Sequence, residues 1–473
     1  MIRLVTLFAC LTCLYGCLHV GPDYEAPDTA PFTDNEFVYA GNYASETPLS
    51  NWWTAFEDPV LNDLIEQGTA QNRTLVSAAS NLIAARATLG LTRQNRFPFD
   101  TLTVTTQETR FAAAASPFAG AEALPNVSLV SFGGAASWEL DLFGRVTRTI
   151  EIADAESEAA FAQLVDLQTV IIADIADAYL DLRGAQAQLA VAEQNADVQA
   201  ETLALTETIR DAGRGTDLDV EQARAQLETT RSTIPPLRSR IVTAANQIAV
   251  LIGETPSAVT ELVDTDGPLP TIETALPIGD PAELLRRRPD VAASERTLAA
   301  AFNQIGLEVA EAYPKVDLVG GVAVEADGFD VLTLPTALAF NIGPSISWSL
   351  TDLLRAKNLI ASARAGGDAA FANFEQTILL ALAETETALN SQAQLQEQVV
   401  HLRVAEEATL AAAELSRIRF ENGRSTFLQV LDAEGRALAA SDQRVAVETE
   451  IARAQVDVFR ALRAGPHFLS EAK

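Results

Sequence analysis

The sequence contains few of the side chains that carry out catalysis or bind metals. Its three cysteines, Cys10, Cys13 and Cys17, all lie near the N-terminus, and its three histidines are scattered at positions 19, 401 and 467. A zinc site or a nucleophilic triad needs His or Cys side chains that come together. No glycine-rich phosphate loop or nucleophile elbow is present either. We therefore expect no enzyme activity, no cofactor and no metal site.

The chemistry that the N-terminus does support is lipid attachment. A short positive region is followed by an apolar run, Leu4 to Leu14, that is too short to span a bilayer. Leu14-Tyr15-Gly16-Cys17 resembles a lipobox, which predicts a signal peptide over residues 1–16 and acylation (palmitate) of Cys17. Leu at position 18, rather than Asp, favours the outer membrane, where several acyl chains would anchor the protein. The alternative is an ordinary cleaved signal without lipid.

The charge of the chain limits the partners that it is expected to have. The formal net charge is −31, which is a poor match to nucleic acid or to an anionic membrane surface. Most of these carboxylates are expected to form solvated helix faces. The alternative is that some of these carboxylates line a negatively charged lumen or funnel.

The chain contains an internal repeat. Trp138-Glu139-Leu140 recurs as Trp348-Ser349-Leu350, and Gly213-Arg214-Gly215-Thr216 recurs as Gly423-Arg424-Ser425-Thr426, both at an offset of 210 positions. Two landmarks that keep the same spacing in both halves predict two copies of one structural unit.

The periodicity of apolar residues predicts the contents of each copy. Each begins with Asp-Pro and a helix, then changes to period-2 patterns, and then returns to helical spacing. Ile234-Pro235-Pro236 predicts a kink or break in the first returning helix. The predicted domains are an arm over 17–57, a first repeat over 58–253 (β-hairpin 100–140, helical hairpin 145–252), a linker over 254–279, a second repeat over 280–465 (β-hairpin 315–350, helical hairpin 356–464) and a tail over 466–473.

The helices predicted to follow each β-hairpin are unusually long. Residues 145–212 contain no proline, and about 65 helical residues would reach roughly 100 Å. Globular helices average about 11–12 residues. This length is typical of a coiled coil.

The number of strands predicts an oligomer. One chain supplies four strands, whereas about eight is the smallest closed barrel. An open sheet edge facing lipid has unsatisfied backbone groups. The strands must therefore close with other copies of the chain, or lie in a soluble sheet. Three chains would supply twelve strands, so we expect a homotrimer.

Several motifs together resemble the TolC-like outer-membrane efflux proteins, and among them the NodT/OprM type of lipoprotein. The resemblance covers the chain after residue 17. Its residues are Cys17 with Val20-Gly21-Pro22-Asp23-Tyr24 and Pro27, Trp52-Trp53 with Phe56 and Asp58-Pro59, Trp138 to Arg145, Arg287-Arg288-Pro289-Asp290-Val291, and Gly423 with Leu431-Asp432-Ala433.

The resemblance implies a fold and a function. The fold would be mainly α with a β-barrel part: a trimer whose 12-stranded outer-membrane barrel continues into a long periplasmic α-helical barrel. The function would be a passive exit duct for toxic compounds or drugs in a multidrug efflux system. Its partners would be outer-membrane lipid, a periplasmic adaptor and an inner-membrane pump of the RND type, and no nucleic acid.

The resemblance also implies a gate. Leu428 and Asp432 match a family pattern in which Leu is followed four positions later by Asp, so both would face one side of a helix. Asp211 and Asp217 flank the first helical tip and are further candidates. The alternatives are seam packing for Leu428, a solvated charge for Asp432, and a favourable helix-dipole position for Asp217 and Asp219.

The helical tips are the predicted docking site for the adaptor. Gly213 and Gly423 follow helix ends, where glycine adopts positive φ at low cost, and Thr216 and Thr426 are candidate N-caps. Four basic residues are candidates for locking the gate: Arg210, Arg214, Arg419 and Arg424. Because the family places a basic residue near Glu421, the details of this lock differ here.

Four tryptophans have two interpretations each. Trp138 and Trp348 are expected either in an interfacial belt or packed at the turn into the helix. Trp52 and Trp53 are expected to pack the arm onto the body.

Three other functions remain as alternatives. An exit duct for type I protein secretion would share this architecture. A periplasmic coiled-coil scaffold explains the helices but not the two matching strand hairpins. A lipid-anchored enzyme lacks clustered catalytic side chains.

Overall fold

The structure is a computed structural model that describes residues 20–32, 36–39, 41, 43–44, 50–109, 127–326 and 337–465. The predicted signal peptide, Cys17, the predicted tail over 466–473 and the tips of both β-hairpins lie outside the described residues. The chain divides into two compact units. The sheet unit comprises the described parts of residues 1–27, 82–160 and 294–374, and the hairpin unit comprises those of 28–81, 161–293 and 375–473.

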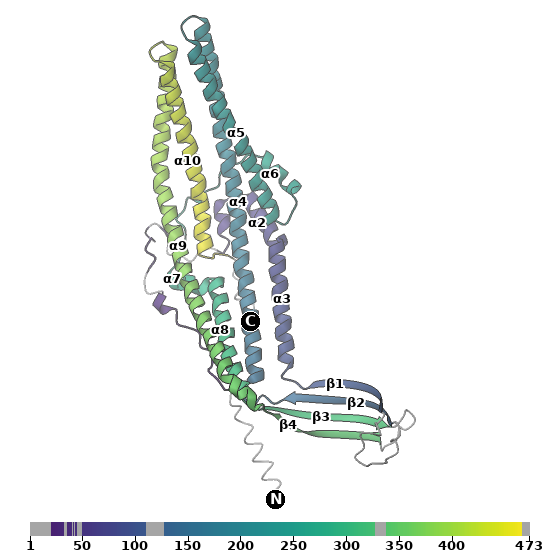
Figure 1. Ribbon diagram of the computed structural model, residues 1–473. Coiled ribbons are helices and arrows are strands. Elements are labelled where there is room, and N and C mark those ends of the chain that lie inside the picture. The colour runs from purple at the N-terminus through teal and green to yellow at the C-terminus, as the bar shows by residue number, and fades with distance from the viewer. Residues whose placement is uncertain are drawn as a thin grey trace. The chain divides into compact units, whose positions relative to one another are not determined.

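The sheet unit contains one antiparallel sheet with the strand order β1-β2-β3-β4 (Figure 1). Its strands are β1 (Phe99–Thr109), β2 (Val127–Glu139), β3 (Lys315–Ala326) and β4 (Leu338–Ser347). Each repeat supplies one hairpin, and the two copies meet where β2 pairs with β3, with Trp138 opposite Leu318. The two predicted strand hairpins therefore lie side by side in a single sheet.

Small residues pack the helices of the sheet unit closely. The helices concerned are the later part of α3 (Arg73–Gln94), the early part of α4 (Arg145–Asp211), most of α8 (Pro289–Ala310) and the start of α9 (Leu350–Glu421). Leu89 packs with Val146 and Ala153, and Ala155 packs with Ala299. Alanine permits this close approach and favours the helical state.

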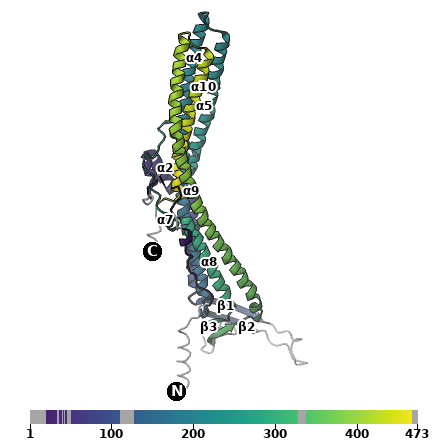
Figure 2. The same ribbon diagram turned by 90° about the vertical axis from the view of Figure 1, so that its left-hand side faces the viewer.

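The hairpin unit contains two long helical hairpins that lie side by side (Figures 1 and 2). One is formed by α4 and α5 (Asp217–Leu251), and the other by α9 and α10 (Phe427–Ala461). α4 has 67 residues and α9 has 72, which confirms the prediction of unusually long helices. Near the tips, Leu203, Ala223 and Val430 join α4, α5 and α10 in one apolar cluster.

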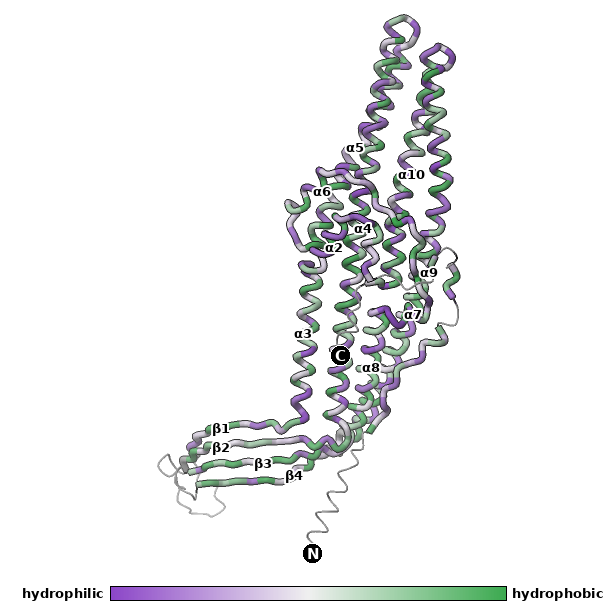
Figure 3. Tube along the Cα trace, turned by 180° about the vertical axis from the view of Figure 1, so that it is seen from behind, coloured by the Kyte–Doolittle hydropathy of each residue, from purple (hydrophilic) through white to green (hydrophobic). Residues whose placement is uncertain are grey.

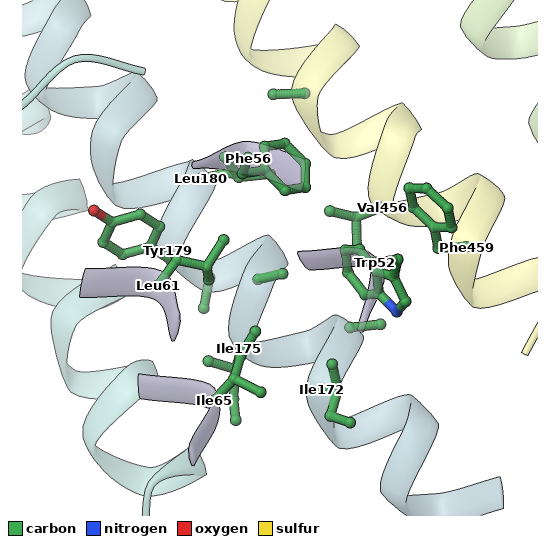
Figure 4. Close-up of a cluster of buried hydrophobic side chains, with 14 of the residues drawn as sticks. Trp52, Phe56, Leu61, Ile65, Ile172, Ile175, Tyr179, Leu180, Val456 and Phe459 are labelled. Carbon is green, nitrogen blue, oxygen red and sulfur yellow. The ribbon is translucent and has the colours of Figure 1, made fainter. Parts of the chain in front are cut away.

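The main hydrophobic core of the hairpin unit lies where the N-terminal arm meets the long helices (Figure 4). Trp52 is buried, stacks on Phe459 with ring centroids 4.9 Å apart, and donates its indole N–H to the carbonyl of Ala464 at 3.0 Å. Trp53 contacts Trp52 edge-on. The prediction that these two residues pack the arm onto the body is confirmed.

The helix that opens each repeat is interrupted, which the sequence did not predict. In the first copy α2 (Pro59–Gln71) ends at Asn72, whose side-chain oxygen caps α3 by accepting from the N–H groups of Thr74 and Leu75. In the second copy α7 (Pro281–Arg287) is separated from α8 by Arg288, because a residue that precedes proline is held in the extended region.

One predicted helix break and one predicted boundary are corrected, and the predicted linker contains some structure of its own. α5 runs unbroken through Pro235 and Pro236, which are exposed, so water reaches the carbonyls that these prolines leave unpaired. α9 begins at Leu350 rather than at 356, and Ser349, a favoured N-cap type, precedes it. The predicted linker over 254–279 contains a short helix, α6 (Thr260–Asp264), and buries Val259, Leu276 and Ile278.

Candidate functional site

The four-stranded sheet has one apolar face and one polar face. Side chains alternate between the two faces of a strand, and the ladder register aligns residues across the sheet in rows. The row Leu102, Gly134, Val322, Phe340 lies on one face. The next row, Thr103, Gly133, Ala323, Ala339, lies on the other face.

The apolar face is exposed. We define it by residues whose side chains share the face of Leu102 and Phe340: Leu102, Val104, Phe132, Trp138, Leu318, Val322, Leu338, Phe340, Ile342 and Ile346. Phe340 is 80% exposed and Ile342 is 76% exposed, and hydrophobic residues run along all four strands (Figure 3). A contiguous exposed apolar face of this size marks contact with lipid or with another protein.

The polar face carries hydroxyl, amide and carboxylate groups. It includes Thr101, Thr103, Thr105, Ser131, Ser137, Asp317, Glu325, Asn341 and Ser345. A groove of about 370 Å³ lies over this sheet and is lined by Thr103, Glu325 and Asn341, among others. Hydration of these groups requires that this face meet water.

Two glycines occupy crowded positions on the polar face. A Cβ at Gly133 would lie 2.9 Å from the Cβ of Ala323, and a Cβ at Gly321 would lie 2.7 Å from Oδ1 of Asn341. On the apolar face, a Cβ at Gly134 would have no neighbour closer than 3.9 Å. Glycine at positions 133 and 321 therefore leaves room for the neighbouring strand.

Trp138 and Trp348 are anchored in the same way in the two copies. Trp138 donates its indole N–H to the carbonyl of Arg96 at 3.0 Å, and Trp348 donates to that of Ala312 at 3.2 Å. Both carbonyls belong to the segment between a helix and the strand that follows it. Since both rings are also exposed, the two interpretations coincide: the N–H group is fixed at the turn while the ring is free for an interfacial belt.

Both helical tips close with the same backbone geometry. φ is +72° at Gly213 and +70° at Gly423. At the first tip, the N–H of Arg214 donates to the carbonyl of Ile209, and the N–H of Gly213 donates to the carbonyl of Arg210. The second tip repeats both hydrogen bonds at the equivalent positions. This is a Schellman motif, whose αL position favours glycine. A Cβ at Gly423 would lie 3.6 Å from Nη2 of Arg214, so the two tips are in contact.

The predicted cap residues begin the returning helices. Thr216 forms a capping box with Asp219: the Asp219 N–H donates to the Thr216 hydroxyl at 3.2 Å, and the Thr216 N–H donates to the Asp219 carboxylate at 3.1 Å. At the second tip, the N–H of Thr426 donates to Oε1 of Gln429 at 3.3 Å. Capping therefore accounts for Asp219.

Leu428 and Asp432 lie together on the surface of α10. Leu428 is 62% exposed, so it is not packed in the seam of its own chain. Asp432 forms an i,i+4 ion pair with Arg436 at 3.1 Å. The structure therefore places an apolar and a charged side chain next to each other, one turn apart, free to meet another copy of the chain or a lumen.

One of the four candidate lock residues forms ion pairs at a tip. Arg210 lies 2.7 Å from the carboxylate of Asp211 and 3.7 Å from that of Asp217, and the hydrogen bond to Asp211 raises the pKa of Arg210. Its ion pair with Asp217 joins the end of α4 to the start of α5. Within the part of the chain that the structure describes, the other candidates, Arg214, Arg419 and Arg424, have no carboxylate within 4 Å.

Two buried arginines were not predicted as organising residues. In the hairpin unit, Arg288 is 1% exposed and contacts Asp290 at 2.5 Å, Glu384 at 3.0 Å and the carbonyl of Ala461 at 2.7 Å. Burial opposes ionisation of Asp290, but the hydrogen bond and charge of Arg288, the charge of Arg463 and the N–H of Val291 together outweigh it and lower the pKa of Asp290. The only signal in the sequence was the Arg-Arg-Pro-Asp motif, which does not say which arginine is buried.

Arg148 is the buried arginine of the sheet unit. Its guanidinium lies 2.6 Å from Asp23 and 2.9 Å from Glu151. Asp23 belongs to the N-terminal arm, so this ion pair fixes the arm against α4. Across the described ranges, no group of three His, Cys, Asp or Glu side chains is placed to hold a metal ion.

A sheet with one exposed apolar face and one polar face, in a chain with two long helical hairpins, is the architecture of a TolC-like outer-membrane channel protein. Residues 64–254 and 281–462 match the outer membrane efflux protein family. The chain belongs to this family, and it is located in the outer membrane.

Individual relatives agree with this assignment. The chain is 29% identical over 465 residues to the probable efflux pump outer membrane protein SepC of Pseudomonas putida, covering 96% of this chain and 95% of that protein. It is 27% identical over 440 residues to nodulation protein T of Rhizobium leguminosarum bv. trifolii, covering 92% and 91%. It is also similar to the solved structure of the outer-membrane channel OprN, with a TM-score of 0.90, 40% identity, and coverage of 94% of this chain and 99% of that one.

Proposed function

We propose that three copies of this chain form the outer-membrane exit duct of a tripartite efflux system, which conducts small toxic compounds passively out of the cell. The observation that carries this proposal is the two-faced sheet. Its exposed apolar face fits lipid, and its polar face fits a water-filled interior.

The edges of the sheet require other copies. In the described chain, β1 and β4 each pair on one side only. The backbone groups on their free sides need partners within lipid. When β4 of one copy meets β1 of the next, the pair is antiparallel, and three copies give a closed barrel of twelve strands.

The helical tips fit the role of a gate. Leu428 and Asp432 would repeat three times around the axis, giving an apolar ring beside an acidic ring. Arg210, with Asp211 and Asp217, would restrain the first tip. Arg214, Arg419 and Arg424 would then be available to an adaptor that docks at Gly213, Gly423, Thr216 and Thr426.

The comparisons support the assembly. Relatives that are similar over nearly the whole chain are named as outer-membrane proteins of efflux pumps. We infer that this chain works with a periplasmic adaptor and an inner-membrane pump of the RND type, and that Cys17 carries an acyl anchor in the outer membrane. Intact-mass measurement of the mature protein tests the lipid directly.

Conductance of the purified full-length protein in a planar bilayer tests the duct. We expect discrete channels of low open probability in the wild type and a higher open probability in Leu428→Ala. Leu218→Ala is the matched control, because Leu218 holds the equivalent place in the first repeat. If wild type, Leu428→Ala and Asp432→Ala all failed to conduct, the duct would be rejected.

A further inference from the structure

The pairing of β2 with β3 joins the two repeats and supplies a template for the free edges of the sheet. β2 ends the hairpin of the first repeat, β3 begins that of the second, and Trp138 lies opposite Leu318 between them. β4 and β1 hold the equivalent places, since β4 ends a hairpin and β1 begins one. Within the described chain they are the two outer strands of the sheet (Figure 1). A second copy of the chain can therefore repeat, between β4 and β1, the junction that β2 and β3 already form.

The two hairpins have the same internal register. The aromatic-proline breaks before β1 and β3 lie 216 positions apart, and the tryptophans at the ends of β2 and β4 lie 210 positions apart. Phe99 pairs with Ser137 in the first hairpin, and Lys315 pairs with Ser347 in the second. The two offsets carry the first of these pairs onto the second. The same offsets therefore give, for every β2–β3 pair, the equivalent positions in β4 and β1.

One pair at the repeat junction recurs at the free edges with both residue types kept. Trp138 and Leu318, which lie opposite each other, correspond to Trp348 and Leu102. Trp138 is 36% exposed and Leu318 is 37% exposed, whereas Trp348 is 53% exposed and Leu102 is 71% exposed. The pair at the free edges is therefore the more exposed one, as expected of two side chains whose neighbouring strand belongs to another copy.

The lengths of the strands agree with a missing neighbour. β2 runs past its ladder with β1, through Trp138 and Glu139, and these two residues pair with β3 alone. β4 ends at Ser347, so the equivalent residues, Trp348 and Ser349, lie outside the strand. A strand on the free side of β4 would extend β4 as β3 extends β2.

On the basis of the trimeric duct proposed above, we propose that β4 of one copy pairs with β1 of the next in the register that places Trp348 opposite Leu102. Apolar side chains then meet toward lipid and hydroxyl groups meet toward the interior, and such cross-strand pairs stabilise a sheet. The register sets three further pairs: Ile346 with Val104, Ser347 with Thr103, and Ser345 with Thr105.

The neighbouring registers fit less well. A slip of one residue would place the apolar side chains of β4 beside the polar ones of β1. A slip of two residues keeps the faces, but in one direction it places Trp348 opposite Asp100. In the other direction Leu102 falls opposite Leu350, which is already the first residue of α9. The register of the repeat junction is therefore the one that suits both the side chains and the backbone.

Disulfide cross-linking between copies of the purified full-length protein tests this register. Directly opposite residues have Cβ atoms about 4.5–5.5 Å apart, and diagonal neighbours about 7–8 Å. A disulfide needs about 3.5–4.5 Å, which small strand movements reach only from the direct position. Oxidation with copper phenanthroline should therefore shift two matched double variants from monomers to covalent trimers on denaturing gels: Thr103→Cys with Ser347→Cys, and Thr105→Cys with Ser345→Cys.

The matched control contains the same four substitutions in crossed combination. Thr103→Cys with Ser345→Cys, and Thr105→Cys with Ser347→Cys, should remain monomers on the same gels. Wild type oxidised in parallel controls for Cys17. Light scattering of the reduced samples shows beforehand that each variant is a trimer.

The outcomes separate the register from the duct. Cross-linking of the crossed pairs in preference to the matched pairs, or of no pair in trimeric samples, overturns the register and leaves the duct standing. A wild-type protein that neither forms trimers nor conducts overturns the proposed function itself.

A second measurement serves if the cysteine variants fail to assemble. The temperature of trimer dissociation is measured for Leu102→Ala, Trp348→Ala and the double variant. Because residues in contact are coupled, the double variant should lose less than the sum of the two single losses. Leu102→Ala combined with Ile342→Ala, at a distant position of β4, should lose the full sum. Additive losses for Leu102 and Trp348 would overturn their contact.

Discussion

Gly133 lies directly opposite Ala323 in the β2–β3 ladder, and a side chain at position 133 would meet that neighbour at 2.9 Å. The same Cβ would lie 3.0 Å from the carbonyl of Val322. Backbone atoms yield less readily than a flexible side chain, so a side chain at position 133 would have to displace the neighbouring strand.

Gly133→Ala should therefore weaken the barrel. We expect a loss of about 1–3 kcal/mol, the usual cost of overpacking, seen as a lower temperature of trimer dissociation on electrophoresis in detergent. Gly134→Ala, on the apolar face at the next position in sequence, is the control and should dissociate at the wild-type temperature. Equal effects of the two variants would show that the polar face is not the crowded one.

The two faces of the sheet predict opposite responses to charge. Phe340→Arg puts a cation on the apolar face, which costs about 2–4 kcal/mol at the middle of a bilayer, whereas Asn341→Arg puts it on the polar face. We expect Phe340→Arg to reduce the amount of folded protein in the outer membrane and Asn341→Arg to retain it. Quantitative immunoblotting of membrane fractions measures both. Normal insertion of Phe340→Arg would contradict lipid contact.

Local chemistry made much of this architecture predictable. Gly213 and Gly423 are typical of the end of a helix, and Thr216 and Thr426, three positions later, are typical of the start of the next one. The sequence therefore predicts where each helical hairpin turns. Segments of alternating polar and apolar residues after Pro98 and Pro314 predict the strands. Because one chain supplies only four strands, the sequence also predicts that a closed barrel needs several copies of the chain.

Other features depend on tertiary contacts that no local pattern reports. Arg286, Arg287 and Arg288 are adjacent in sequence, yet Arg288 is the one enclosed by Asp290, Glu384 and Ala461. The unbroken α5 is another case, since the exposure that makes Pro235 tolerable is set by its neighbours in space. The pairing of Arg210 with Asp217 likewise required the geometry of the tip.

Buried carboxylates predict how the stability of the protein changes with pH. Asp177 lies in a cluster with Arg453 and Arg460, but burial outweighs both cations and raises the pKa of Asp177 to about 6. The pKa of an aspartate in the unfolded chain is about 3.9. Between these two pKa values the folded state binds more protons than the unfolded state. The free energy of unfolding therefore falls as the pH rises from about 4 to 6, and above pH 6 it stays at the lower level.

Asp177→Asn should flatten this dependence. We expect the difference in free energy of unfolding between pH 7 and pH 5 to shrink by about 1 kcal/mol, because the amide does not titrate. Thermal melts followed by circular dichroism at the two pH values measure it. Asp197→Asn, at an exposed position of the same helix, should keep the wild-type difference. An unchanged pH difference in Asp177→Asn would mean that this carboxyl titrates alike in both states.

The tip ion pairs make a prediction about gating. Arg210 joins Asp211 and Asp217 at the first tip, and each of these solvent-exposed pairs is individually weak. Because three copies act together in the proposed trimer, Arg210→Ala should raise the open probability about two- to tenfold in planar-bilayer recordings. Arg424→Ala is the control, because Arg424 has no carboxylate within 4 Å in the described chain, and it should gate like wild type. High salt should reduce the difference in open probability between the wild type and Arg210→Ala, because it screens the ion pairs of Arg210 in the wild type. If Arg424→Ala opened the channel and Arg210→Ala did not, the restraint would lie between copies of the chain rather than within one tip.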